Sequence, residues 1–288
     1  MSNSTTAFLG LSDDADPRDR PPRTTADDDA LLRDLKGVFK RDWSNHPRSQ
    51  QRAIGPSEIG HPCARRLATT IMGFDAIAAD GDPLPAWLGT AGHAKFETAV
   101  DHDNEQIIDA WLRDRTQPCT NVDRGDGVPI GRWLTERRVE VRPGLSGTAD
   151  LFDTWTDTVI DLKFPGVTRL RLYQKNGPSP EYRIQAHAYG RGYRRAGFDV
   201  RRVAIWFIPR GGNLRSSFVW SEPYSDAIID DALAKLDNIA VAISDLGIEE
   251  HPERLALIAR TPHDCEFCPF FTPQAGHPEP QACRGGAK

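Results

Sequence analysis

The chain contains no run of 18 apolar residues, and its N-terminus is polar and acidic, without a charged segment followed by an apolar stretch. A membrane-spanning helix needs about 20 apolar residues, and a signal peptide needs an apolar core. We therefore expect no membrane span, no secretion and a place in the cytoplasm. No internal repeat is visible either.

Cysteine is scarce, with five residues in 288, and the number is odd. Disulfides form mainly in secreted proteins, and an even set of cysteines is their usual sign. In a chain without a secretion signal, we interpret the five cysteines as thiols or metal ligands in a reducing compartment.

Charge is nearly balanced over the whole chain but uneven along it. The net charge is −5, with 39% hydrophobic and 27% charged residues, which is ordinary for a globular protein. Whole-chain charge therefore does not indicate a nucleic-acid partner. Residues 163–215, however, contain twelve Lys and Arg against only Glu181 and Asp199. This segment predicts a positive surface suited to a phosphate backbone, or a solvated face with counter-charges elsewhere.

The length suits one compact body with a small attached module. Residues 1–28 are rich in Ser, Thr, Asp, Arg and Pro without an apolar period, so we expect a disordered leader. Residues 29–262 would form the core. Residues 263–288 would form a cysteine tail with too little apolar content to fold without a metal.

Periodicity and breaker residues divide the core into elements. They predict helices at 30–43, at 57–73 with Ser57 as N-cap, at 86–111 with a break near 101–104, at 182–195 and at 225–246. They also predict an antiparallel meander of strands at 133–141, 147–155 and 158–164, a strand buried on both faces at 203–208, and its hairpin partner at 214–220. We interpret 165–181 as a basic loop.

Two carboxylates and a lysine occur on the meander. Side chains alternate along a strand, so Asp161 and Lys163 are expected on one face. Asp150, on the neighbouring strand, is within reach of the same patch. Phosphodiester hydrolysis needs oxygen ligands for Mg²⁺ or Mn²⁺, a hydroxide and positive charge near the phosphate. Lys163 could orient the water, deprotonate it or stabilise negative charge, or it could simply pair with Asp161.

Four motifs occur in a fixed order along the chain. A G-x-x-x-H-x-x-x-E helix is followed by a G-x-x-D strand, a D-x-K strand and Q-x-x-x-Y on the next helix. The order resembles the RecB/Cas4 branch of the PD-(D/E)XK nuclease superfamily, especially the Cas4-type exonucleases of phages. The resemblance covers residues 57–283. The matching residues are Gly89, His93, Glu97, Gly147, Asp150, Asp161, Lys163, Gln185 and Tyr189.

The resemblance implies an α/β fold with a restriction-endonuclease-like core, in which helices flank a mixed central sheet. It implies that His93 binds the metal together with Asp150 and Asp161. Glu97 would belong to the site or support it. Gln185 and Tyr189 would contact DNA or support the lysine. Two departures from the pattern are Phe164, where a small residue or Thr is commoner, and Asp161 in place of the more usual Glu.

Four cysteines form a candidate metal centre. Cys265 and Cys268 make a C-x-x-C loop, which alone fits a zinc site, a redox pair or chance. With Cys283 and Cys63, the resemblance implies ligands of a [4Fe-4S] cluster that joins an N-terminal segment to the tail. Zinc is the alternative metal, and His277 is an alternative to Cys283.

Three further residues, Cys119, Arg65 and Arg66, have expected roles. Cys119 lies outside the pattern and is taken as an unliganded thiol. Arg65 and Arg66, which follow Cys63, are expected to contact DNA.

The function that these features predict is a Mg²⁺- or Mn²⁺-dependent deoxyribonuclease acting at single-stranded or duplex DNA ends. The resemblance suggests a phage-encoded enzyme of the host cytoplasm that works with a recombination or replication protein. One alternative is an inactive DNA-binding accessory protein with the same fold. Another is a zinc-organised nucleic-acid-binding module. Retention of the histidine, both aspartates and the lysine argues against an inactive site.

Overall fold

The computed structural model describes residues 26–46, 53–77, 82–120, 127–274 and 276–286. The chain forms two compact units, residues 1–50 and residues 51–288. The predicted leader lies outside the described residues, except that Ala26 to Asp28 begin helix α1 (Ala26–Asn45). The apolar side chains of α1 include Leu31, Leu35 and Val38, which are more than half exposed. In the described parts of the chain, no helix has the length and apolar character to cross a membrane.

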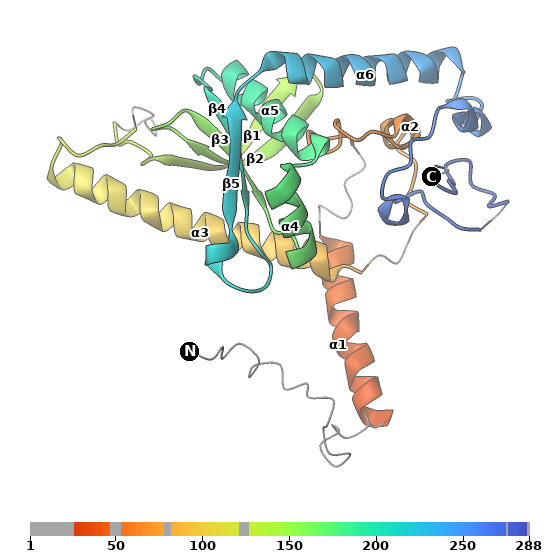
Figure 1. The fold of residues 1–288 in the computed structure, drawn as a ribbon, viewed down its shortest axis with the longest axis horizontal. Helices are drawn as coiled ribbons and strands as arrows, with labels where there is room; N and C mark the ends of the chain where they lie inside the picture. Colours follow the sequence, from red (N-terminus) through yellow and green to blue (C-terminus); the bar gives the residue numbers. More distant parts are fainter. Residues whose placement is uncertain (1–25, 47–52, 78–81, 121–126, 275, 287–288) are drawn as a thin grey trace. The chain divides into compact units, whose positions relative to one another are not determined.

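The second unit is built on a five-stranded mixed sheet in the order β1-β2-β3-β4-β5. All neighbours are antiparallel except β3 and β4, which are parallel (Figure 1). The structure therefore confirms the predicted meander and the α/β class with a mixed sheet. The strands are β1 (Trp133–Arg142), β2 (Leu145–Asp153), β3 (Thr158–Lys163), β4 (Arg202–Phe207) and β5 (Phe218–Pro223).

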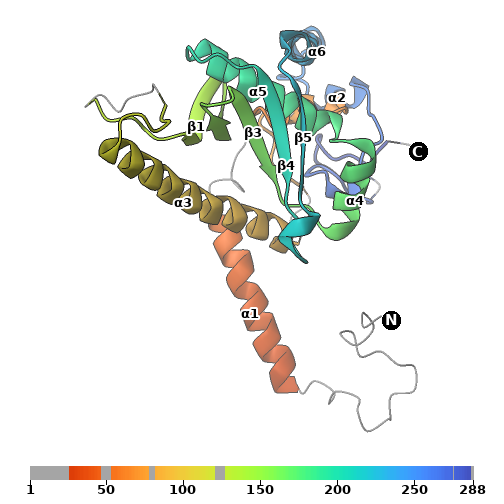
Figure 2. The ribbon, with the colours of Figure 1, turned by 60° about the vertical axis from the view of Figure 1, so that its left-hand side comes forward.

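Helices lie on both sides of this sheet, as the views from two directions show (Figures 1 and 2). Helix α5 contacts β1 to β4, α6 packs on α5, and α2 packs on α6. Helix α3 lies on the other side and contacts β1. The helices are α2 (Ala64–Ile71), α3 (Leu84–Arg113), α4 (Val167–Asn176), α5 (Pro180–Arg195) and α6 (Asp226–Asp245), and short 3₁₀ helices include η4 (Pro252–Leu257) and η5 (Cys265–Phe267).

Two apolar clusters hold these layers together. One fills the space between the sheet and α5, where the Phe152 and Tyr193 rings stack with centroids 4.7 Å apart. The other lies among α2, α6 and η4, and includes Leu67, Leu236 and Leu255. Burial of such side chains contributes about 1.5–3 kcal/mol each. The sheet is therefore fixed against α5.

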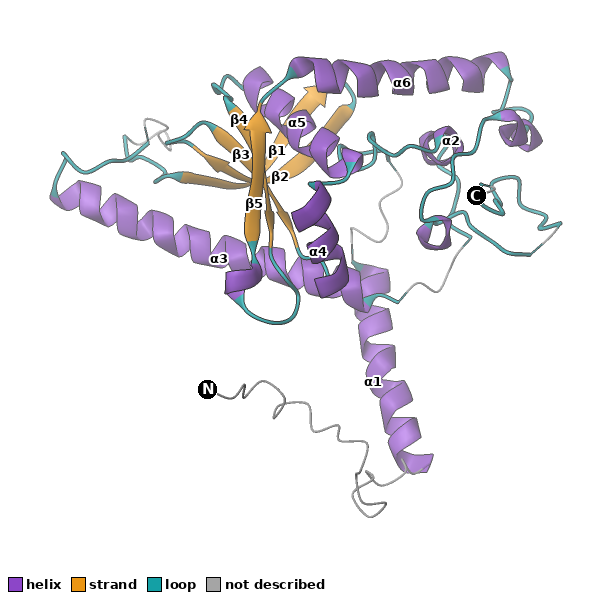
Figure 3. Ribbon diagram, viewed as in Figure 1, coloured by secondary structure: helices purple, strands orange, loops and turns teal. Residues whose placement is uncertain are grey.

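Three predicted details of the helices are wrong. Helix α2 begins at Ala64, because residues 56–60 form turns and Cys63 is the extended N-cap (Figure 3). Helix α3 is continuous through the expected break, where the buried Asn104 side chain bonds the backbone of β1. Part of the predicted basic loop is helix α4, which buries Leu170 and ends at Gly177.

Candidate active site and cysteine cavity

Three carboxylates occupy adjacent positions on three neighbouring strands. Leu151 on β2 pairs with Ile160 on β3 in an antiparallel register. The residues next to them, Asp150 and Asp161, therefore lie opposite each other. On β1, Thr135 pairs with Leu151 and Arg137 pairs with Ala149, so Glu136 lies opposite Asp150. Strand pairing therefore produces a row of acidic residues, Glu136 on β1, Asp150 on β2 and Asp161 on β3.

Asp161 lies in the interior beside a lysine. It is 0% exposed, and its Oδ2 is 2.6 Å from the Lys163 Nζ. Because side chains alternate along β3, Asp161 and Lys163 point to the same face as Val159, whose side chain packs in the core under α5. The Lys163 ammonium also lies 4.7 Å from the centre of the Tyr182 ring on α5. The structure thus brings the D-x-K pair together on one face of the sheet, as its spacing predicts.

The protonation of Asp161 reflects this burial. Loss of solvent raises the pKa of the Asp161 carboxyl to about 6, the Asp150 charge acts in the same direction, and Lys163 opposes both. In the described part of the chain, neither oxygen of Asp161 has a hydrogen-bond partner apart from the Lys163 ion pair. A buried carboxylate with unused lone pairs is costly unless a cation is bound there.

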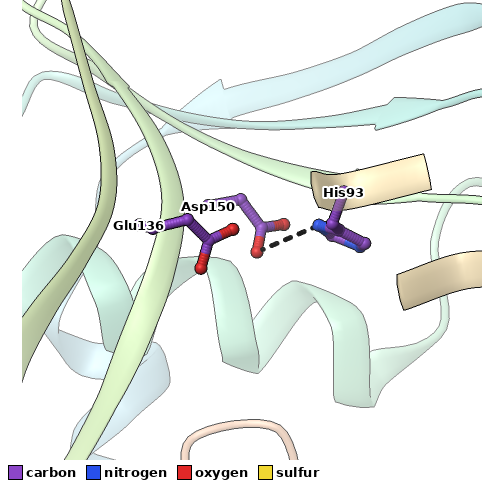
Figure 4. Close-up of side chains that lie close together, drawn as sticks. All are labelled: His93, Glu136 and Asp150. Atoms are coloured by element: carbon purple, nitrogen blue, oxygen red, sulfur yellow. Dashed lines mark ion pairs between the residues drawn. The ribbon is translucent and has the colours of Figure 1, made fainter. Parts of the chain in front are cut away.

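His93 reaches the row from helix α3. Its Nδ1 is 3.5 Å from Asp150 Oδ1, while Asp150 Oδ2 accepts a hydrogen bond of 2.7 Å from the Leu162 amide. Figure 4 shows the imidazole and the carboxylate facing each other. The hydrogen bond from the Leu162 amide fixes the orientation of Asp150 and leaves Oδ1 directed at His93. Helix α3, strand β2 and the Leu162 amide therefore hold the two expected metal ligands His93 and Asp150 close together.

Glu136 was not expected from the sequence. One carboxylate oxygen of Glu136, one of Asp150 and a ring nitrogen of His93 all lie within 4.8 Å of one another (Figure 4). Counting back from the Pro143-Gly144 turn misses this residue, because the register between β1 and β2 shifts between Glu140 and Arg142. No local motif marks Glu136, so the pairing in the folded sheet is what identifies it.

The donor set suits a divalent cation. Carboxylate oxygens are the ligands that Mg²⁺ and Mn²⁺ prefer, and an imidazole nitrogen also suits Mn²⁺ and other transition metals. Among the described residues, His93, Glu136 and Asp150 bring such donors within 4.8 Å of one another. Asp161 on the next strand is outside that group, and its Oδ2 lies beside Lys163 while its Oδ1 has no hydrogen-bond partner. The residues present therefore fit a metal at this site.

Close packing holds the site in place. The Phe164 ring meets the His93 imidazole edge-on, with centroids 5.3 Å apart at 66°. A Cβ at Gly92 would lie 2.8 Å from that ring, and a Cβ at Gly147 would lie 2.7 Å from Pro56. By contrast, a Cβ at Gly89 would meet nothing within 4 Å. Gly92, which precedes His93, is thus the glycine of α3 that packing requires.

Other expected residues lie elsewhere or inside the protein. Glu97 is half-buried on α3 and does not belong to the group of His93, Glu136 and Asp150. Gln185 and Tyr189 are buried on α5, and the Gln185 Nε2 donates to the Tyr189 Oη at 3.4 Å. The interior position of this pair favours the supporting role over direct contact with DNA, which stays a prediction.

Counter-charges neutralise much of the basic segment at 163–215. Lys163 and six of its arginines lie within 4.0 Å of carboxylates, most of which belong to other parts of the chain. Within the described ranges, five basic residues of this segment have no carboxylate at that distance. The six arginines are Arg169, Arg183, Arg191, Arg194, Arg195 and Arg201, and the remaining five residues are Arg171, Lys175, Arg202, Arg210 and Arg215.

Four cysteines line a single cavity, which is separate from the row of acidic residues on β1 to β3. Cys63 contributes from the start of α2, Cys265 and Cys268 from η5 and its end, and Cys283 from the tail. The Cys283 amide donates to Phe270, which ties the last cysteine to the C-x-x-C loop. Among the described residues, no three of the four sulfur atoms lie within 4.8 Å of one another. The structure thus places the four predicted cysteines around one cavity, without gathering three of their sulfur atoms at one point.

The alternatives lie outside this cavity. His277 is not among its lining residues, and its Nδ1 accepts a hydrogen bond from the Glu279 amide. Cys119 is also elsewhere, and its thiol lies 3.9 Å from the Gly131 carbonyl oxygen.

Arginines surround the cavity. Arg65 and Arg66 both line it, together with Arg260 and His61. The Arg65 Nε donates to the Ile258 carbonyl at 2.9 Å, and its Nη2 donates to the Ala256 carbonyl. Burial raises the pKa of the Cys268 thiol, and a backbone hydrogen bond at Phe270 and the charge of Arg66 oppose this only in part. These contacts direct Arg65 toward the end of η4, and its contact with DNA stays a prediction.

The sequence matches neither a protein-family model nor a curated protein. Among solved structures, the chain is similar to an alkaline exonuclease from Laribacter hongkongensis at 14% identity, over 76% of this chain and 100% of that one, with a TM-score of 0.42. A structure of the same exonuclease in complex with dAMP aligns at 16% identity over 68% and 93%, with a TM-score of 0.32. A phage-related exonuclease from Haemophilus somnus 129PT aligns at 14% identity over 65% and 82%, with a TM-score of 0.38. Likeness at this level carries no conclusion about activity.

Proposed function

We propose that the protein is a divalent-metal-dependent deoxyribonuclease of the RecB/Cas4 type that hydrolyses phosphodiester bonds at DNA ends. The observation that carries this proposal is the environment of Asp161. Its carboxylate is fully buried next to Asp150 and, apart from the Lys163 ammonium at 2.6 Å, has no hydrogen-bond partner in the described chain. A buried ion pair with an unused carboxylate oxygen adds little stability by itself, whereas a bound cation would use that oxygen.

Asp150, Asp161 and His93 are the residues that would hold Mg²⁺ or Mn²⁺. A bound ion of this kind lowers the pKa of a water ligand and stabilises negative charge on phosphate oxygens. The protein supplies the geometry, because β2, β3 and α3 each contribute one ligand from a rigid element.

Lys163 supplies a fixed positive charge at the end of β3. Its ammonium is held by Asp161 and by the face of Tyr182, so it stays beside the carboxylates. In the hydrolysis, the water oxygen forms a bond to phosphorus, the bond from phosphorus to the leaving oxygen breaks, the water gives up a proton to solvent, and the leaving oxygen receives one. We assign to Lys163 the stabilisation of charge on the phosphate during this exchange.

We further propose that Cys63, Cys265, Cys268 and Cys283 bind a [4Fe-4S] cluster with a structural role. Four thiolates around one zinc ion at about 2.3 Å would lie about 3.8 Å apart. A zinc ion held in that geometry is the alternative occupant, since four thiolates suit either metal. Such a cluster would close a loop of two hundred residues and so restrict the unfolded chain.

The nuclease proposal is tested with end-labelled single-stranded and duplex DNA, with Mn²⁺ and with chelator, using the wild type, Asp161→Asn and Lys163→Met. We expect cleavage by the wild type with Mn²⁺ alone, and rates lower by about 10²–10³-fold or more in either variant. Asp161→Asn removes a buried charge, so the metal-free variant should unfold at a higher temperature than the metal-free wild type. An active Lys163→Met enzyme would refute the assignment of the site.

A further inference from the structure

Glu136 has an unusual backbone in the middle of a strand. Its φ is +42°, a conformation that residues other than glycine adopt at a cost. The neighbours Thr135 and Arg137 remain paired with β2, so the irregularity is confined to one residue. Strain of this kind persists where the surrounding structure enforces it, and it concentrates at functional sites.

The irregularity changes which way β1 faces. Leu134 and Val139 are five residues apart, so in a regular strand they would point to opposite faces. Both are nevertheless buried in the apolar cluster between the sheet and α5. A local break in alternation lies between them, and Glu136 is the residue of positive φ there. As at a β-bulge beside an active site, such a break re-aims a side chain.

Strand pairing places the Glu136 carboxylate beside the proposed metal ligands. Its oxygen lies within 4.8 Å of a nitrogen of His93 and an oxygen of Asp150 (Figure 4). A second observation points to a cation nearby. The Oδ1 of the fully buried Asp161, on the strand next to Asp150, has no hydrogen-bond partner among the described residues, while its Oδ2 lies 2.6 Å from the Lys163 ammonium. Like charges on neighbouring strands repel each other unless a cation lies between them.

We propose that Glu136 is a further ligand of the divalent cation, binding it on the β1 side of Asp150, at the end of the row remote from Lys163. This inference rests on the proposed nuclease function and deepens it. The cation would then be held by three strands and one helix. Because Glu136 is exposed, whereas Asp161 is buried, Glu136 is the carboxylate of the row that borders on solvent.

The test is Mn²⁺ binding measured by electron paramagnetic resonance and by the metal-induced rise in melting temperature, on the full chain. Glu136→Gln keeps the shape and removes the charge. Glu136→Gly also removes the backbone strain, because glycine adopts positive φ readily. Glu140→Gln is the matched control, since Glu140 is an exposed carboxylate of the same strand that pairs with Arg195 at 3.3 Å.

We expect both Glu136 variants to bind Mn²⁺ about tenfold or more weakly and to lose most of the metal-induced rise in melting temperature. The Glu140 control should bind like the wild type. Wild-type Mn²⁺ affinity in Glu136→Gln would overturn the inference while leaving the nuclease proposal intact, provided that this variant still cleaves DNA. Absence of Mn²⁺ binding and cleavage in the wild type would instead refute the proposed function itself. Glu136→Gly guards against misfolding, because it should melt no lower than the wild type without metal.

Discussion

The Phe164 ring meets the His93 imidazole edge-on at 5.3 Å, joining the residue after the D-x-K strand to the histidine on α3. Phe164 is also one of the two positions at which the chain departs from the nuclease pattern that it resembles. The same ring fills the space over Gly92, where a Cβ would lie 2.8 Å from it. The departure is therefore matched by local packing, in which an aromatic ring supports the orientation of the histidine.

Replacing Phe164 by Ala should weaken metal binding without removing a ligand. The imidazole would lose its neighbour and occupy several orientations, so we expect Mn²⁺ affinity to fall by about tenfold. Phe164→Leu fills more of the same space and should lose less. Isothermal titration with Mn²⁺ measures both, and equal affinity in Phe164→Ala and the wild type would show that the ring has no part in placing His93.

Cys265→Ala should yield colourless protein of lower stability. It removes one of four thiolates from the cavity, so a cluster absorbing near 400 nm should not assemble. Cys119→Ser is the matched control, because Cys119 lies outside the cavity, and it should keep both colour and melting temperature. The comparison uses anaerobically purified protein, absorbance spectra and thermal melts. A variant at Cys265 that keeps colour and stability would remove this residue from the ligand set.

DNA affinity should depend on the basic residues that lack carboxylate neighbours in the described chain. Arg171 and Lys175 are four residues apart on α4, on one exposed face, so both suit contact with phosphates. The double variant to Ala should weaken DNA binding and reduce the slope of log affinity against log salt by about 0.9 per charge removed.

Arg191→Ala is the control for this prediction. Arg191 is held by Asp226 and Asp230 at 3.0 and 2.7 Å, so its loss should reduce stability and leave the salt slope unchanged. Fluorescence anisotropy with labelled DNA and chelated metal gives the slopes. The reverse result, a changed slope only for Arg191, would show that the exposed charges of α4 do not meet DNA.

Stability should fall in mild acid through His187. This side chain is fully buried, lies 2.7 Å from Glu222, and accepts a hydrogen bond from the Ser225 amide at the start of α6. Burial lowers the pKa of His187, and Glu222 only partly offsets this. The unfolded chain therefore takes up the proton first, so stability is complete above about pH 6.5 and declines as pH falls below it.

His187→Gln removes this titration while keeping an N–H donor near Glu222. Urea unfolding between pH 7 and pH 5 should show a smaller loss of stability in the variant than in the wild type. Identical pH dependence in the two proteins would mean that His187 does not titrate differently in the folded and unfolded states.

Local sequence features predicted the meander and the residues on it well. Alternation fixes that Asp161 and Lys163 share a face, and turn residues separate β2 from β3. The strand at β4 was predicted from its continuous apolar residues, and it lies between β3 and β5 with Val203 to Ile205 buried. These features depend on residues close to one another in the chain, so they could be predicted from the local sequence.

What the sequence did not show depends on partners far along the chain. The continuity of α3 depends on Asn104, whose polar side chain suggested a break and instead bonds the backbone at Trp133. The role of Glu136 depends on strand register and on one residue of positive φ. The sequence showed the basic residues of 163–215 but not the carboxylates that neutralise them, because these include Glu140 and Asp264, which lie outside the segment.

Anomalous diffraction from a crystal of the protein grown with Mn²⁺ tests the central claim most directly. The account predicts a manganese peak about 2.2 Å from carboxylate oxygens of Asp150 and Asp161 and from a ring nitrogen of His93, with the Lys163 ammonium beside it. A crystal of cleavage-active protein in which manganese binds elsewhere, leaving Asp161 paired with Lys163 alone, would contradict it.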